Sequence, residues 1–141
     1  MNVWLYEDDA EAAEWVKQAK TGYRTWARKV DKIEEVIVHD RTGFEALMAT
    51  AGTSPPDLLV VDLEIDGNDN AGVDAIKHAR ELDSQAEMPI VVFSSNGTLA
   101  ARKSAYEAGA TSYIKKPPRL ERRVDALADI FGYWIELNQR R

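Results

Sequence analysis

The sequence predicts an α/β fold, a doubly wound parallel sheet of five strands with helices on both faces. Two observations carry this prediction. Short apolar runs alternate five times with longer stretches of helical periodicity, and this alternation is typical of parallel strands joined by right-handed helical crossovers. The run Leu58–Val61, which follows Pro55 and Pro56, is apolar at every position, as expected of a strand buried on both faces.

Composition limits the alternatives. A chain of 141 residues with 45% apolar and 30% charged residues suffices for one folded domain and is too short for two. No apolar run is long enough to span a membrane, and the N-terminal residues lack the basic region of a signal peptide. The absence of cysteine excludes disulfides and thiolate metal sites and is compatible with the cytoplasm, where we expect the protein.

Charge and histidine content exclude two further classes of site. The net charge of −6 argues against a broad basic face for nucleic acid, so we expect no direct contact with nucleic acid and none with membranes. His39 and His78 share no close ligand spacing, which argues against a histidine metal site.

The first strand is predicted at Val3–Tyr6 and a helix from near Asp9. Apolar residues at steps of three and four give this helix one stripe, namely Ala13, Val16, Ala19, Tyr23, Trp26 and Val30. Gly22 interrupts the stripe, so the helix is either long and bent or divided in two. Residues Ile33–Val38 are rich in β-branched side chains and predict the second strand.

The middle of the chain predicts a helix, a strand, a polar loop and another helix. Thr42 and Glu45 have the spacing of a capping box, and Gly52–Pro56 ends the helix that they would begin. Leu58–Leu63 is the third strand. Residues Ile65–Ala71 form a polar loop, and the helix after it has apolar positions Val73, Ile76, Ala79 and Leu82.

The last third predicts two strands and two helices. Pro89 precedes the fourth strand, Ile90–Phe93, and Thr98 is a candidate cap of an alanine-rich helix that Gly109 ends in a left-handed conformation. Thr111–Lys115 is the fifth strand. The final helix has a regular apolar stripe of Leu120, Val124, Leu127, Phe131 and Trp134.

Polar residues stand at the carboxyl ends of these strands, where open α/β sheets bind their ligands. Glu7 and Asp8 follow the first strand, Asp62 the third, Ser94 the fourth and Lys116 the fifth. In a parallel sheet these ends meet at one edge. A role as a helix cap is a weak explanation for Asp62, because the next helix starts some ten residues later.

Asp9, in contrast, is favoured as an N-cap of the helix that it precedes. Carboxylates that crowd together repel one another unless a cation intervenes, and oxygen ligands suit Mg²⁺. With a bound metal, Lys116 and Ser94 would hold the oxygens of a phosphoryl group. Asp62 would then be the nucleophile that becomes an acyl phosphate.

Four motifs in this order resemble the receiver domain of bacterial two-component response regulators: residues Val3–Asp9, Asp57–Leu63, Pro89–Ser95 and Ala105–Pro117. The resemblance covers nearly the whole chain. It implies a single receiver domain over residues 1–141 with no output domain visible, and the flavodoxin-like strand order 2-1-3-4-5.

The resemblance also assigns roles to site residues. Asp62 would be the phosphoacceptor, which takes a phosphoryl group from a sensor histidine kinase or a phosphotransfer protein. Glu7 and Asp8 would be the acidic pair, and they would bind Mg²⁺ together with Asp62 and the backbone carbonyl of Glu64. Lys116 would be the lysine of the phosphoryl site. No organic cofactor and no enzymatic activity beyond its own phosphotransfer and dephosphorylation are implied.

The switch of the family maps onto two further residues. Ser94 matches the hydroxyl residue that is drawn toward the phosphoryl group, and Tyr113 matches the aromatic residue that then rotates inward from the surface. The face of the fourth helix, fifth strand and fifth helix would change shape for a downstream protein target, or for a homodimer. In the family, Pro117 would follow a cis peptide bond.

Departures from the family pattern keep two alternatives open. The segment from Lys20 to Asp31 is longer than usual, and the loop after Asp62 is longer and lacks the usual Met-Pro. The chain could therefore be a pseudo-receiver, an interaction module that is not phosphorylated. A haloacid-dehalogenase-type phosphohydrolase is a poorer alternative, because Glu64 stands where that family needs a second aspartate and the cap domain is missing.

Overall fold

The strands form one parallel sheet in the order β2-β1-β3-β4-β5, as predicted. The computed structural model describes residues 1–24, 33–52, 55–68, 70–83 and 87–138. The strands are β1 Asn2–Tyr6, β2 Glu34–Val38, β3 Leu58–Val61, β4 Ile90–Ser94 and β5 Ser112–Lys115. The helices are α1 Ala12–Arg24, α2 Arg41–Met48, α3 Ala71–Leu82, α4 Leu99–Ala108, α5 Leu120–Phe131 and the π-helix η2 Gly132–Leu137.

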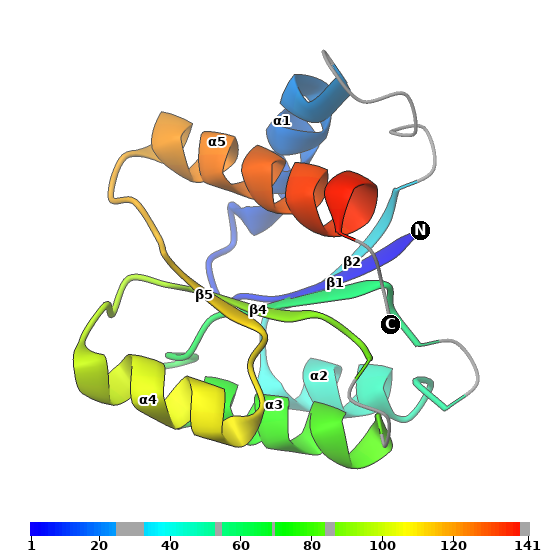
Figure 1. Cartoon of the computed structure of the whole chain (residues 1–141), viewed down its shortest axis with the longest axis vertical. Coiled ribbons are helices and arrows are strands. Elements are labelled where there is room, and N and C mark those ends of the chain that lie inside the picture. Colours follow the sequence, from blue (N-terminus) through cyan, green and yellow to red (C-terminus); the bar gives the residue numbers. More distant parts are fainter. Residues whose placement is uncertain (25–32, 53–54, 69, 84–86, 139–141) are drawn as a thin grey trace.

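The helices cover both faces of the sheet. Figure 1 shows α1 and α5 on one face and α2, α3 and α4 on the other. Each face has its own apolar core: one contains Trp15, Phe93 and Phe131, and the other contains Phe44 and Met48. Since helices lie on both sides, every residue of β3 and β4 is buried. None of the helices in the described ranges is long and apolar enough to cross a bilayer.

The first helix differs from the prediction at its start and at one position of its apolar stripe. It begins at Ala12 rather than near Asp9, because Asp9 Oδ1 accepts a hydrogen bond from Glu11 N at 2.8 Å and makes a turn there. Asp9 therefore closes the turn before α1 and does not directly precede the helix as the predicted N-cap would. Ala13 is exposed, and the buried stripe is Ala12, Trp15, Val16 and Ala19.

The helix α1 continues through Gly22 to Arg24, so it does not divide at Gly22. Trp26 and Val30 of the predicted stripe lie outside the described residues. The predicted stripe is confirmed at Val16 and Ala19 and wrong at Ala13. Alanine fits equally well at Ala12 and Ala13, so helical periodicity alone does not choose between these neighbouring positions.

Helix caps were predicted correctly for α4 and wrongly for α2. The N-cap of α2 is Asp40, whose Oδ1 accepts a hydrogen bond from Gly43 N at 2.7 Å. Thr42 lies inside the first turn, because Asp40 has the extended backbone that an N-cap needs. In α4, Thr98 is the N-cap, and Gly109 ends the helix with φ +119°, in the left-handed region.

Two other predictions for the C-terminal third need correction. The described residues contain no cis peptide bond, so the cis bond expected before Pro117 is wrong; the trans form is the ordinary preference of such a bond. The last apolar stripe is buried at Leu127 and Phe131, but Leu120 is exposed at the start of α5. Beyond Phe131 the chain continues as a π-helix.

Candidate functional site

The register of the sheet brings the predicted site residues to one edge. Asp62 N donates to Tyr6 O at 2.9 Å, so Asp62 directly follows the last paired residues of β1 and β3. Lys116 N donates to Ser94 O at 2.7 Å and continues the pairing of β4 and β5. Glu7, Asp62, Ser94 and Lys116 are therefore neighbours because their strands are parallel and end together.

Three carboxylates meet at this edge. Glu7, Asp8 and Asp62 each offer one oxygen, and these oxygens all lie within 4.8 Å of one another. Glu7 and Asp62 are buried, whereas Asp8 is exposed. These three acids line a pocket to which Glu64 also contributes. The use of the Glu64 carbonyl as a metal ligand stays a prediction. Since α3 begins only at Ala71, Asp62 does not cap a helix.

A buried lysine joins two of the acids. Lys116 is only 5% exposed, and its Nζ donates to Glu7 Oε1 and, at 3.1 Å, to Asp62 Oδ2. The same Nζ lies 5.7 Å from the ring centroids of both Trp15 and Phe93. A buried ammonium needs such partners, because an unpaired one would be costly to bury. The pairs hold Asp62 in one orientation.

The cluster carries more negative charge than Lys116 can compensate. Burial raises the pKa of Glu7 to about 8, the charge of Asp62 adds to this rise, and Lys116 opposes it. Near neutral pH the Glu7 carboxyl therefore holds a proton for much of the time. A divalent cation would offset the same charge. The donor set consists of oxygens only, which fits a hard ion such as Mg²⁺.

The two predicted switch residues meet at the loop between β4 and α4. Ser94 is buried, and its Oγ accepts a hydrogen bond from Asn96 N at 3.3 Å. The Tyr113 hydroxyl donates to Asn96 O. Burial raises the pKa of Tyr113, and a hydrogen bond with Ser94 acts in the opposite direction. In this structure Tyr113 is thus half-buried against the loop rather than on the surface.

The unusual loop after Asp62 folds back onto the site. Asp66 N donates to Asp8 Oδ2 at 3.0 Å. A bridge between Ile65 and Asn68 closes the loop, and its turn places Asp66 at φ +53° and Gly67 at φ +74°. The composition of the loop predicted a turn but gave no sign of its contact with Asp8. Such a contact orients a carboxylate that could also bind a metal.

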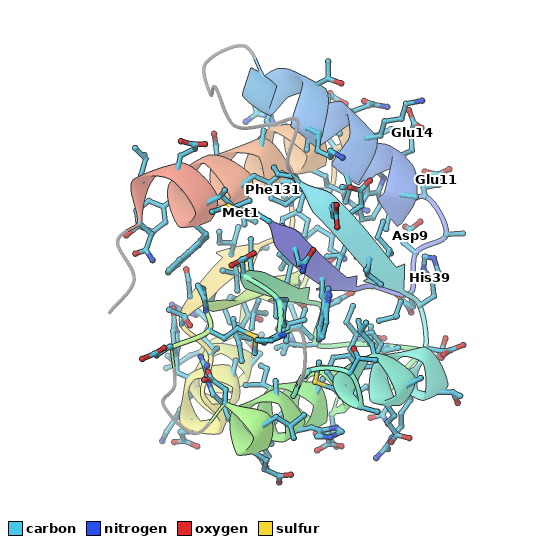
Figure 2. All side chains as sticks on the ribbon, turned by 90° about the vertical axis from the view of Figure 1, so that its right-hand side faces the viewer. Met1, Asp9, Glu11, Glu14, His39 and Phe131 are labelled. Carbon is cyan, nitrogen blue, oxygen red and sulfur yellow. The ribbon has the colours of Figure 1, made fainter. Side chains whose placement is uncertain are left out.

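Two neighbours of the site were not predicted. His39, excluded as a metal ligand, follows β2 and places its Nδ1 2.8 Å from Glu7 O, as a donor to that carbonyl; Figure 2 shows His39 and Asp9 at the same end of the sheet. Arg123 of α5 lines the site pocket of about 260 Å³. Its place four residues before the buried Leu127 puts it on the inward side of α5, but this spacing does not indicate which part of the sheet it meets.

The chain is similar to known proteins along nearly its whole length. A family model described as the response regulator receiver domain matches residues 3–128. The DNA-binding transcriptional regulator NtrC of Salmonella typhimurium is 23% identical over 139 residues, which are 99% of this chain and 26% of that protein. The chemotaxis protein CheY of Bacillus subtilis is 30% identical over 93 residues, 66% of this chain and 73% of that protein. The chain thus spans about a quarter of the length of NtrC.

Solved structures share the fold. The phosphorylated cyanobacterial phytochrome response regulator RcpA has a TM-score of 0.82 at 21% identity, and the match covers 99% of this chain and 96% of that chain. The Mn²⁺-bound form of response regulator Rcp1 has a TM-score of 0.78 at 17% identity, and the match covers 99% and 98%.

Proposed function

This chain belongs to the family of response regulator receiver domains, and we propose that it accepts a phosphoryl group on Asp62 from a histidine kinase or a phosphotransfer protein. One observation carries the proposal. The buried Lys116 ammonium bridges Asp62 and Glu7 within a cluster of three carboxylates at the carboxyl edge of the sheet. Buried charge of this kind is expensive to maintain for stability alone, and it is typical of a site that handles charge.

The two oxygens of Asp62 have different surroundings. Oδ2 accepts a hydrogen bond from Lys116 Nζ at 3.1 Å, whereas Oδ1 accepts a longer one from Glu64 N at 3.4 Å. In the proposed reaction one carboxylate oxygen attacks phosphorus, an O–P bond forms as the N–P bond to the donor imidazole breaks, and the electron pair returns to the imidazole. Lys116 would stabilise the charge on the phosphoryl oxygens.

Glu7, Asp8, Asp62 and the backbone carbonyl of Glu64 would hold Mg²⁺. When bound, the ion supplies charge neutralisation for the phosphoryl oxygens. The close approach of the three carboxylates supports this assignment, and a structure of the relative Rcp1 is described as Mn²⁺-bound. Glu7 would have to give up its proton to join the metal site, so the occupancy of the metal site would increase with pH.

The proposed output is a rearrangement of the loop after β4. Ser94 now accepts from Asn96 N, and Tyr113 donates to Asn96 O. A phosphoryl group on Asp62 would attract the Ser94 hydroxyl and leave Asn96 N without this acceptor. The α4-β5-α5 face would then change shape for a downstream protein or a second copy of this chain. Helix α4 exposes two large apolar side chains, Leu99 and Tyr106.

The test compares two substitutions that each remove one carboxylate. Wild-type protein incubated with Mg²⁺ and acetyl phosphate should acquire a hydroxylamine-sensitive phosphoryl group. Asp62→Asn should abolish it. Asp66→Asn is the matched control, because asparagine tolerates the left-handed φ of +53° at that position. Persistence of the acyl phosphate in Asp62→Asn would refute the assignment.

A folded wild-type chain that acquires no phosphoryl group would instead favour the pseudo-receiver, an interaction module. The phosphohydrolase alternative predicts turnover of a phosphomonoester, and we expect none beyond the protein's own dephosphorylation. The cytoplasmic location stays a prediction from the sequence.

A further inference from the structure

We propose that Arg123 is a second cation of the phosphoryl pocket, which attracts the anionic phosphodonor and binds the oxygens of the phosphoryl group on Asp62. The inference rests on the proposed function and deepens it, since it assigns a donor-binding role to a residue of α5. It starts from the observation that Arg123 lines the same pocket as Asp62 and Lys116.

Two contacts hold the Arg123 side chain at the pocket. Its Nε donates to Pro117 O at 2.7 Å, and its guanidinium carbon lies 5.1 Å from the ring centroid of Trp15. The indole of Trp15 is buried, and Lys116 Nζ lies 5.7 Å from the same centroid. One buried aromatic ring thus supports both cations of the pocket, and cation–π attraction favours both positions.

The outer nitrogens of Arg123 have no strong partner. The nearest acid is Asp9, and its Oδ2 lies 4.0 Å from Arg123 Nη1, too far for a hydrogen bond. Asp9 already accepts from Glu11 N through its other oxygen. Within the described ranges, neither Nη atom of Arg123 has a hydrogen-bond partner. A planar fork of N–H donors that faces a pocket is the geometry that binds phosphoryl oxygens in pairs.

The charge balance of the pocket shows why a second cation matters. The lining includes five acids and only two cations, Lys116 and Arg123; the acids are Glu7, Asp8, Asp9, Asp62 and Glu64. Lys116 is already paired with two of the acids. An anionic donor therefore approaches a negative pocket, and among the described residues that line it Arg123 is the cation whose outer Nη groups make no hydrogen bond. Its side chain is 22% exposed, so it can meet a donor that arrives from solvent.

The test uses Arg123→Gln with the neighbouring Arg122→Gln as the control, because Arg122 is exposed on the same turn of α5. Both variants lose one positive charge. Binding of beryllofluoride with Mg²⁺ is measured by NMR titration, and the acetyl phosphate concentration that gives half the maximal phosphorylation rate is measured beside it. Because Arg123→Gln loses a charged hydrogen bond, it should bind beryllofluoride about tenfold more weakly and need an acetyl phosphate concentration about tenfold higher. Arg122→Gln should change little in either measurement.

A purely structural role of Arg123 would give a different pattern. Arg123→Gln should not weaken Mg²⁺ binding in the absence of phosphodonor, since the loss of a nearby cation favours another cation. If Arg123 merely held α5 against α1, Arg123→Gln would lower the unfolding midpoint and the affinities for both Mg²⁺ and beryllofluoride. Arg123→Lys keeps the positive charge without the planar pair of N–H donors. Its affinity for beryllofluoride should lie between those of the wild type and Arg123→Gln.

The outcomes separate this inference from the function on which it rests. Equal beryllofluoride binding by Arg123→Gln and Arg122→Gln, in a wild type that is phosphorylated on Asp62, would overturn the role of Arg123 alone. A wild-type protein that neither binds beryllofluoride nor accepts a phosphoryl group would overturn the proposed function and this inference with it.

Discussion

Replacement of Gly72 by alanine should destabilise the protein and disturb Asp62 together. Gly72 lies in the first turn of α3, and its N donates to Leu63 O at 3.0 Å. A Cβ at this position would lie 2.2 Å from Asp62 O and 2.4 Å from Leu63 Cα. Both obstructing atoms belong to the backbone, so no change of side-chain rotamer can relieve the overlap. Either α3 or the segment that carries Asp62 must move.

The size of the effect follows from two opposing contributions. Forcing one extra carbon into a packed interior costs roughly 3 kcal/mol when the neighbours are rigid. Alanine regains about 1 kcal/mol over glycine because it favours the helical conformation. The net loss in the free energy of unfolding should thus be about 2 kcal/mol. Displacement of Asp62 from Lys116 should also slow phosphorylation by acetyl phosphate.

The assay is urea unfolding of Gly72→Ala beside Gly52→Ala. A Cβ at Gly52 would meet no atom within 4 Å. The free energy of unfolding of this control variant should therefore lie within about 0.5 kcal/mol of the wild-type value. Equal stability of both variants, with unchanged phosphorylation, would refute the claim that the start of α3 is packed against the Asp62 backbone.

Three further predictions concern charge and helix ends. Without Mg²⁺, the free energy of unfolding should fall by about 1 kcal/mol per pH unit between pH 4.5 and about 8, because folded Glu7 keeps its proton over that range while unfolded Glu7 loses it. Glu7→Gln should flatten this slope in chemical denaturation, and an unchanged slope would disprove the raised pKa. Thr98→Ala removes the hydrogen bond that Thr98 Oγ1 accepts from Ala101 N and should cost about 1 kcal/mol in urea unfolding; no loss would contradict the cap. Gly109→Ala should lower the melting temperature, because φ is +119° and a Cβ would lie 2.7 Å from Arg80 Cγ; a stability equal to the wild type would contradict this geometry.

The fold was predictable because several signals agreed along the chain. The wholly apolar run Leu58–Val61 and the closing glycine Gly109 each left one interpretation, and the structure confirms both. The burial of Ala12 rather than Ala13 in α1 was not predictable, since the two residues are chemically equivalent and only packing against the sheet chooses between them. The cap of α2 was missed because both Asp40 and Thr42 are good N-cap residues.

The site was predictable where residues follow strands and was missed where they do not. Parallel strand ends meet at one edge, so Asp62 and Lys116 could be placed together from the sequence. Arg123 lies on a helix whose rotation relative to the sheet depends on tertiary packing, and the contact of Asp66 N with Asp8 depends on a left-handed turn in an irregular loop. Local propensity does not determine either.

We infer that the acids gathered around Lys116 form a pocket in which Asp62 becomes phosphorylated. The most direct measurement treats the full chain with Mg²⁺ and acetyl phosphate, reduces the acyl phosphate with borohydride and locates the modified residue by peptide mass spectrometry. We expect modification at Asp62 alone, and none when Mg²⁺ is removed. Modification at another carboxylate, or equal modification without Mg²⁺, would contradict it.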